Sequence, residues 1–217
     1  LQAIWIPLYA SGDRSPGHLE LDPFWTKLAR EGLPFLLHVG GSPLQLDKSW
    51  NNNGKPPSKD WMGGGENVRA KDMAVMHQGP ETFISMMVLD GVFEKNPELR
   101  GASVELGAGW VPELLERLDW VVKSWSKVDK NLTQIKRKPS EQLTQQMAFT
   151  PYVFENVGNF IDNSNPELYL FSSDYPHVEG GRDPIGRFEA SLGDRSEEIR
   201  NLFYTENFLR IFPEERV

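Results

Sequence analysis

Short apolar runs alternate with helical patterns along the whole of this 217-residue chain. The runs lack the polar–apolar alternation of period two, so each is expected to be buried on both faces of a sheet. Buried strands that are each followed by a helix predict an α/β fold with a parallel sheet. The expected strands are residues 4–8, 34–38, 102–106, 149–154 and 168–171.

Helical patterns fill most of the sequence between these runs. The longest covers 111–125, where apolar residues recur at three- and four-residue spacing opposite Glu and Lys. Asp22-Pro23 predicts a helix start, and Gly32 predicts the end of that helix. Further helices are expected near residues 81–90, from 139, and at 155–161, 196–203 and 205–212.

One long segment, residues 39–67, breaks this alternation. It is rich in Gly, Pro and Asn and cannot build a core. Because Trp50 and Trp61 stand between flexible stretches, the segment has the composition of an active-site lid.

Charge and composition exclude several classes of protein. Acidic residues outnumber basic ones by 31 to 23, which argues against nucleic acid or an anionic membrane as partner. The absence of cysteine removes disulfides, thiolate metal sites and cysteine nucleophiles. No apolar run approaches the roughly 20 residues of a membrane span. We therefore expect a soluble enzyme with a small-molecule substrate, and a homodimer stays open. The absence of cysteine leaves the compartment open, and the location we expect is the cytoplasm.

Three reactive side chains stand at the carboxyl ends of expected strands: His38, Glu105 and Asp174. In parallel α/β folds these ends converge on one face, where barrel enzymes carry their chemistry. His38 is either a hydrogen-bonded core histidine or a ligand, and the glycines after it allow a ligand to approach. Asp174 is either a helix cap or a site residue, and the turn residues after it favour the site.

Glu105 lies among apolar neighbours, where an ionised carboxylate is costly unless it is paired. Desolvation raises the pKa of such a group and suits it to general acid–base catalysis. The alternative is an ion pair with Arg69, Arg100 or Arg117. His18 and His77 stand in polar surroundings and are expected at the surface or at a hinge.

Several motifs together resemble the amidohydrolase-related family, the branch of the amidohydrolase superfamily that contains aminocarboxymuconate-semialdehyde decarboxylase. The matching blocks are Phe35-Leu-Leu-His-Val-Gly40, residues 91–100, Glu105-Leu-Gly-Ala-Gly-Trp-Val-Pro112, Ser173-Asp-Tyr-Pro-His177 and the closing segment 205–212. The resemblance implies a (β/α)8 barrel of the TIM type with one divalent ion, zinc in the first place and manganese as the alternative.

The resemblance also implies roles for individual residues. His38 and Asp174 match metal ligands, and Glu105 falls where decarboxylase members carry a histidine that acts as acid or base. His177, Tyr175 and Trp110 would shape the substrate pocket. The family's paired His-x-His or Glu-x-His of the first barrel strand has no counterpart in this sequence.

Five βα units are fewer than the eight of a closed barrel, and a catalytic zinc usually takes three protein ligands. We therefore expect residues 1–217 to form one partial barrel domain with strands four to eight and an incomplete metal site, the remaining units lying upstream of Leu1. The expected activity is metal-dependent hydrolysis or decarboxylation of a small organic carboxylate or carbonyl compound, with Asp174 and Glu105 as catalytic residues.

Two alternatives remain. The chain could be a non-catalytic truncated barrel or a piece that pairs with another chain through the exposed edge of residues 4–8. Alternatively, Glu105 and Asp174 could act without a metal, as the paired carboxylates of glycosidases do.

Overall fold

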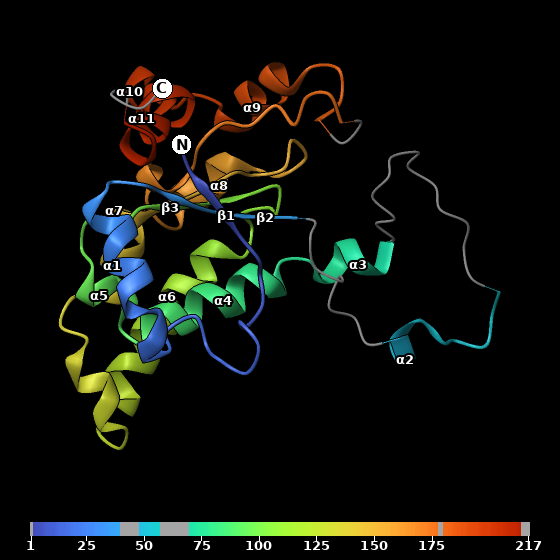
Figure 1. Ribbon diagram of the computed structural model, residues 1–217. Coiled ribbons are helices and arrows are strands. Elements are labelled where there is room, and N and C mark those ends of the chain that lie inside the picture. The colour runs from blue at the N-terminus through green and yellow to red at the C-terminus, as the bar shows by residue number, and fades with distance from the viewer. Residues whose placement is uncertain (1, 40–47, 57–69, 178–179, 214–217) are drawn as a thin grey trace.

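A four-stranded parallel sheet organises the protein. The computed structural model describes residues 2–39, 48–56, 70–177 and 180–213. Its strands follow in chain order, β1 (Ile4–Ile6), β2 (Phe35–His38), β3 (Gly101–Val104) and β4 (Met147–Phe149). Each strand pairs with the next in parallel, as the sequence predicts (Figure 1).

Helices connect consecutive strands and cover the sheet. In Figure 1, α1, α4, α5 and α6 lie below the sheet and α9, α10 and α11 above it. The elements and their bounds are η1 (Leu19–Leu21), α1 (Asp22–Arg30), α2 (Lys48–Asn51), α3 (Ala70–Val75), α4 (Gln78–Leu89), α5 (Val92–Lys95), α6 (Val111–Trp125), η2 (Lys130–Gln134), α7 (Pro139–Gln146), α8 (Val157–Asp162), η3 (Pro166–Leu168), α9 (Pro184–Leu192), α10 (Glu197–Asn201), the π-helical turn η5 (Leu202–Glu206) and α11 (Asn207–Ile211).

The core forms where helices pack on strands β2 and β3. Phe35 and Leu37 of β2 are fully buried, and the Phe35 ring lies so close to Gly101 of β3 that a Cβ there would be 2.4 Å from it. Glycine at position 101 therefore lets a large aromatic ring fill the space between the strands.

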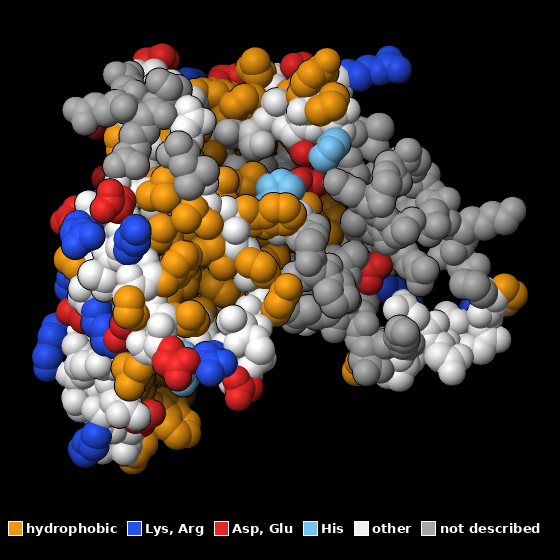
Figure 2. Space-filling model, viewed as in Figure 1, with side chains coloured by type: hydrophobic (Ala, Val, Ile, Leu, Met, Phe, Trp, Pro, Cys, Tyr) orange, Lys and Arg blue, Asp and Glu red, His pale blue; other side chains and the backbone are white. Residues whose placement is uncertain are grey.

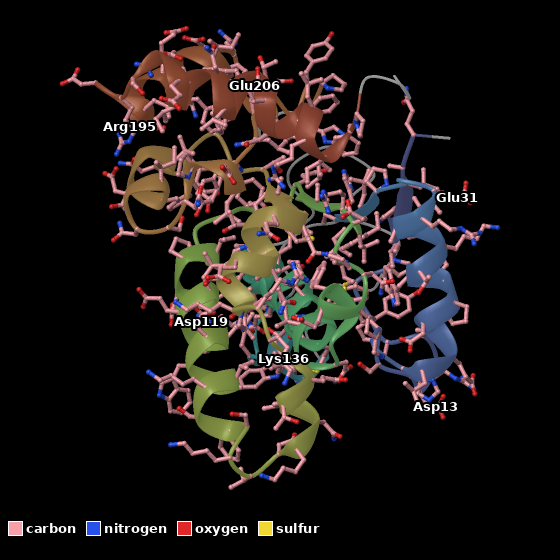
Figure 3. All side chains as sticks on the ribbon, turned by 90° about the vertical axis from the view of Figure 1, so that its left-hand side faces the viewer. Asp13, Glu31, Asp119, Lys136, Arg195 and Glu206 are labelled. Atoms are coloured by element: carbon pink, nitrogen blue, oxygen red, sulfur yellow. The ribbon has the colours of Figure 1, made fainter. Side chains whose placement is uncertain are left out.

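The apolar stripe of α6 is buried along its first half. Leu114, Leu115 and Leu118 are buried, but Trp125, which the periodicity places on the same stripe, is exposed. A 15-residue helix is about 22 Å long, whereas a four-residue strand spans only about 13 Å, so the end of α6 extends past the sheet. Asp119 on α6 also accepts hydrogen bonds from the Ser140 backbone N–H and hydroxyl, at 2.9 and 2.7 Å, which tie it to α7 (Figure 3).

Two strand predictions are wrong in extent. The strand expected at 149–154 lies instead at Met147–Phe149 and shares only Phe149 with the prediction, because Pro151 has no N–H to offer a ladder. Residues 168–171 form one parallel bridge, between Tyr169 and Phe149, and no strand. The backbone N–H of Phe171 donates to the Phe203 carbonyl of η5, so tertiary packing ends the pairing.

The expected lid, residues 39–67, lies largely outside the described residues and stays a prediction. Its described part contains α2, where the Trp50 side chain is exposed. Within the described part of the chain, no helix has the length and apolar character to cross a membrane.

Candidate metal and acid–base site

The carboxyl ends of β2, β3 and the 168–171 segment open into one pocket of about 280 Å³. His38 is the last residue of β2, Glu105 follows β3 directly, and Asp174 and His177 follow the 168–171 segment. Figure 2 shows histidine and acidic side chains gathered at a hollow in the surface. The three segments thus bring together reactive side chains that are far apart in sequence.

Glu105 lies at the centre of the group. Its Oε2 is 2.9 Å from His38 Nε2, and its Oε1 is 3.6 Å from His177 Nδ1. His177 Nδ1 is also 3.4 Å from Asp174 Oδ1. The side chains of Glu105 and Asp174 are only 13% and 19% exposed, against 37% and 43% for His38 and His177, so the carboxylates lie deeper than the imidazoles.

The ring orientation of His38 bears on what the site can bind. Its Nδ1 lies 2.5 Å from the Val39 carbonyl oxygen, which can only accept, so Nδ1 carries the hydrogen of the neutral ring. The lone pair on Nε2 then faces the Glu105 carboxylate at 2.9 Å. Two acceptors this close require a proton between them or a shared cation.

Both carboxylates stand on left-handed backbone, with φ of 59° at Glu105 and 57° at Asp174. Non-glycine residues rarely adopt this conformation, and it recurs at functional sites. At Glu105 the N–H donates to Thr150 Oγ1 at 3.0 Å, and the carbonyl accepts from the Tyr152 hydroxyl at 3.1 Å. The residues after β4 therefore satisfy both backbone polar groups of Glu105.

A comparison with protein families shows which family the chain belongs to. Residues 6–213 match the family described as Amidohydrolase. The chain belongs to the amidohydrolase family. Comparison with curated proteins found no match.

Solved amidohydrolase structures share the fold at low sequence identity. An amidohydrolase from Mycobacterium avium subsp. paratuberculosis K-10 superposes with a TM-score of 0.77 at 24% identity, over 97% of this chain and 51% of that one. A 5-carboxyvanillate decarboxylase from Novosphingobium aromaticivorans DSM 12444, complexed with manganese and 4-hydroxy-3-methoxy-5-nitrobenzoic acid, gives 0.68 at 18% identity, over 98% and 56%. A dihydroxybenzoic acid decarboxylase from Polaromonas sp. JS666, with bound manganese and the inhibitor 2-nitroresorcinol, gives 0.66 at 20%, over 96% and 58%.

These neighbours confirm the expected fold class, a TIM-type barrel of which this chain forms a part. The chain spans about half the length of the solved amidohydrolases it matches. The sequence pattern predicts about two-thirds of a barrel on the count of βα units, and the described residues form four strands of it.

The pocket of this amidohydrolase contains most, but not all, of the predicted site residues. His38, Glu105, Asp174, His177 and the exposed Tyr175 line it. Trp110 is not among the lining residues: its indole N–H donates to the carbonyls of Leu106 and Gly107, at 3.2 and 3.0 Å. A role for Trp110 in substrate binding stays a prediction.

Among the described residues, no arginine forms an ion pair with Glu105. Arg100 pairs with Glu98 at 3.7 Å, Arg117 pairs with Glu81 at 2.7 Å, and Arg69 lies outside the described residues. The ion-pair partners of the Glu105 side chain among the described residues are the two imidazoles, those of His38 and His177.

Sequence reasoning missed three residues around Glu105: Thr150, Tyr152 and Glu155. They follow β4, so the rule that found His38 and Glu105 applies to them too. The strand expected to run to Phe154 hid them, because it placed Thr150 and Tyr152 inside a strand instead of after its carboxyl end.

The donors present fit a divalent ion. One ligand atom each from Glu105, Asp174 and His177 lie within 4.8 Å of one another. Carboxylate and imidazole donors suit zinc and manganese, and three protein ligands are the usual number at a catalytic zinc. His38, whose Nε2 faces Glu105, adjoins this group.

Proposed function

We propose that this amidohydrolase is a metal-dependent hydrolase or carboxy-lyase that acts on a small organic carbonyl or carboxylate compound in the cytoplasm. The observation that carries the proposal is the group of Glu105, Asp174 and His177 at the carboxyl edge of a parallel sheet. Zinc is the ion we favour, with manganese as the alternative. Two structural neighbours hold manganese, which supports a divalent ion of this kind.

A bound divalent ion would supply Lewis-acid polarisation of a substrate carbonyl or carboxylate. Asp174 would hold it, either with His38, the ligand that the sequence motif implies, or with Glu105 and His177, whose ligand atoms lie within 4.8 Å of one another and of that of Asp174. Asp174 would also orient a water molecule and accept its proton. Glu105 lies between His38 and His177, at 2.9 and 3.6 Å, so its carboxylate is placed to move a proton between the reacting atoms and either imidazole.

The pocket lining also bears on the substrate. Among its described lining residues there is no Lys or Arg, whereas Glu105 and Asp174 contribute two carboxylates. A substrate carboxylate would therefore depend on the ion or on protonated His38 and His177 for its countercharge. His177 and Tyr175 would contact the rest of the substrate, which we expect to be small because the pocket is about 280 Å³.

The test is Asp174→Asn in protein loaded with Zn²⁺ or Mn²⁺. Losing a charged ligand should weaken metal binding, measured by calorimetry, by more than about 10-fold. Turnover of small esters, amides and aromatic carboxylates should disappear. Asp194→Asn is the matched control, because Asp194 is exposed and outside the pocket lining. Unchanged turnover in Asp174→Asn would overturn the assignment.

A second candidate rests on the free edge of β1. Within the described residues, β1 pairs with β2 only, and the Trp5 side chain on it is exposed. Such an edge suits a non-catalytic piece that pairs with another chain. Metal stoichiometry measured together with oligomeric state separates the two, because the second candidate requires a metal-free chain.

A further inference from the structure

Side chains of the segment that follows β4 form hydrogen bonds with the loop that carries Glu105. Thr150 Oγ1 accepts from the Glu105 N–H at 3.0 Å, and the Tyr152 hydroxyl donates to the Glu105 carbonyl at 3.1 Å. Thr150 and Tyr152 also line the pocket. Both backbone groups of a left-handed residue are thus held by side chains rather than by a strand partner.

The Glu155 carboxylate forms further hydrogen bonds with the rest of this loop. Its Oε2 accepts from the backbone N–H groups of Ala108 and Tyr152, at 3.0 and 2.7 Å, and its Oε1 accepts from that of Gly109 at 2.9 Å. One carboxylate thereby joins the loop after Glu105 to the segment that holds Glu105.

The environment of Glu155 shows how closely the two segments are packed. Desolvation by burial raises the pKa of Glu155 above its usual value, although the three backbone hydrogen bonds act in the opposite direction. The structure shows it no ion pair with a Lys or Arg among the described residues. Glu155 is half-buried, and desolvating a carboxylate that has no cation beside it costs free energy, which a loop with only a structural role would not require.

Two glycines make the close approach feasible. A Cβ at Gly107, where φ is +68°, would lie 2.8 Å from the Tyr152 ring, and a Cβ at Gly109 would lie 2.9 Å from Glu155 Oε1. The glycines of the Glu105-Leu-Gly-Ala-Gly block thus let Tyr152 and Glu155 reach the loop backbone.

We propose that Glu155 is a positioning residue, which acts through Tyr152 and the 105–109 loop to fix the direction in which the Glu105 carboxylate points. Glu155 itself is not among the residues that line the pocket or that could hold the metal. Its role is to keep Glu105 on the left-handed backbone from which the carboxylate reaches His38 and His177. This inference rests on the proposed function, in which Glu105 moves protons.

The test follows the histidine side chains in the metal-free protein by ¹⁵N NMR of the imidazole rings. Glu155→Gln leaves one acceptor oxygen for three N–H groups and should shift the resonances of His38 and His177. His18, which caps η1 through Nδ1 at the exposed surface, should not shift. Glu116→Gln, on an exposed position of α6, is the matched control and should move none of them.

A second variant guards against loss of folding. Tyr152→Phe keeps the ring that packs on Gly107 but loses the bond to the Glu105 carbonyl, so it should shift the same two histidines. Mn²⁺ binding to each variant, measured by calorimetry, should weaken about 10-fold relative to the parent protein.

The outcomes separate the two proposals. If both variants speed amide exchange in residues 105–111 while the His38 and His177 resonances stay in place, Glu155 is only a structural clamp and the inference fails. If the parent protein binds no Mn²⁺ or Zn²⁺, the proposed function fails. The NMR result then still decides whether Glu155 positions Glu105.

Discussion

Individual residues at the site combine function with local strain. Glu105 and Asp174 both occupy left-handed backbone, which costs on the order of 1–3 kcal/mol for a non-glycine residue. Hydrogen bonds from Thr150 and Tyr152 hold Glu105 in this conformation. In a metal-free protein, Glu105 also lies near a second carboxylate, Asp174. A residue chosen for stability alone would not be glutamate.

Glu105→Gly should therefore leave the metal-free protein at least as stable as the parent. Glycine adopts positive φ without steric cost, a gain on the order of 1–3 kcal/mol. This gain offsets the entropy of about 0.5–1 kcal/mol that glycine adds to the unfolded chain and the loss of the ion pairs with the half-exposed His38 and His177. The free energy of unfolding, measured with urea, should not fall, while catalytic activity should disappear.

Val104→Gly is the control for this prediction. Val104 is the last residue of β3, where glycine has no conformational advantage and an apolar side chain is lost. It should lower the free energy of unfolding by more than about 1 kcal/mol. Equal destabilisation by the two variants would show that the left-handed backbone at Glu105 carries no strain.

What the sequence reveals of these residues depends on one rule. The carboxyl ends of parallel strands meet, so the order of strands and side chains along the chain is enough to predict that His38, Glu105 and Asp174 line one pocket, as they do. The direction of a side chain beyond the strand end is not fixed by that rule. Trp110 shows this, because its indole turns back to the carbonyls of its own loop.

At the scale of elements, side chains of α11 cover the edge of the sheet beyond β4. Arg210 donates to three carbonyl oxygens, those of Gln145, Met147 and Glu167, at 2.7 to 2.9 Å. Burial lowers the pKa of Arg210 to about 10, although the nearby charge of Glu167 acts in the opposite direction. Asn207 adds bonds from its amide to the carbonyls of Pro166 and Tyr169.

Arg210→Met should destabilise the protein more than most surface changes do. The methionine keeps much of the apolar stem but leaves three carbonyls without their donor, each at about 1–3 kcal/mol if it stays buried. Because water can reach part of this site, we expect a loss of about 2–4 kcal/mol in the free energy of unfolding.

Arg187→Met provides the comparison, since Arg187 is an exposed arginine on α9. It should change the free energy of unfolding by less than about 0.5 kcal/mol. If the two arginine variants unfold at the same denaturant concentration, α11 is not held to β4 by Arg210.

These contacts explain which elements the sequence predicts. The α6 helix begins at Val111 and ends at Trp125, as its apolar spacing indicates, because that pattern is local. The 168–171 segment has the composition of a buried strand. Its Phe171 N–H bonds instead to Phe203, a partner more than 30 positions away that no local pattern reveals.

At the scale of the whole molecule, the described residues cover one edge of the sheet and leave the other open. The edge beyond β4 is covered by η3 and α11, whereas β1 pairs only with β2 among the described residues. Hydrophobic side chains gather on the face of the molecule that Figure 2 shows. The alternation of strands and helices predicts the parallel sheet correctly, but it says nothing of what lies against β1.

The open edge predicts that a protein of these 217 residues associates as its concentration rises. Trp5, in the middle of β1, is 54% exposed although it lies in a strand, and an unpaired apolar strand edge favours pairing with another chain. Trp5→Lys places a charge on that edge and should shift sedimentation-velocity profiles towards the monomer. Trp120→Lys is the matched control, because Trp120 is 60% exposed on α6, away from the sheet edge. If both lysine variants reduce association equally, general surface hydrophobicity causes it. An effect confined to Trp5→Lys assigns association to β1, because among the described strands β1 has a backbone edge to which a second chain can pair.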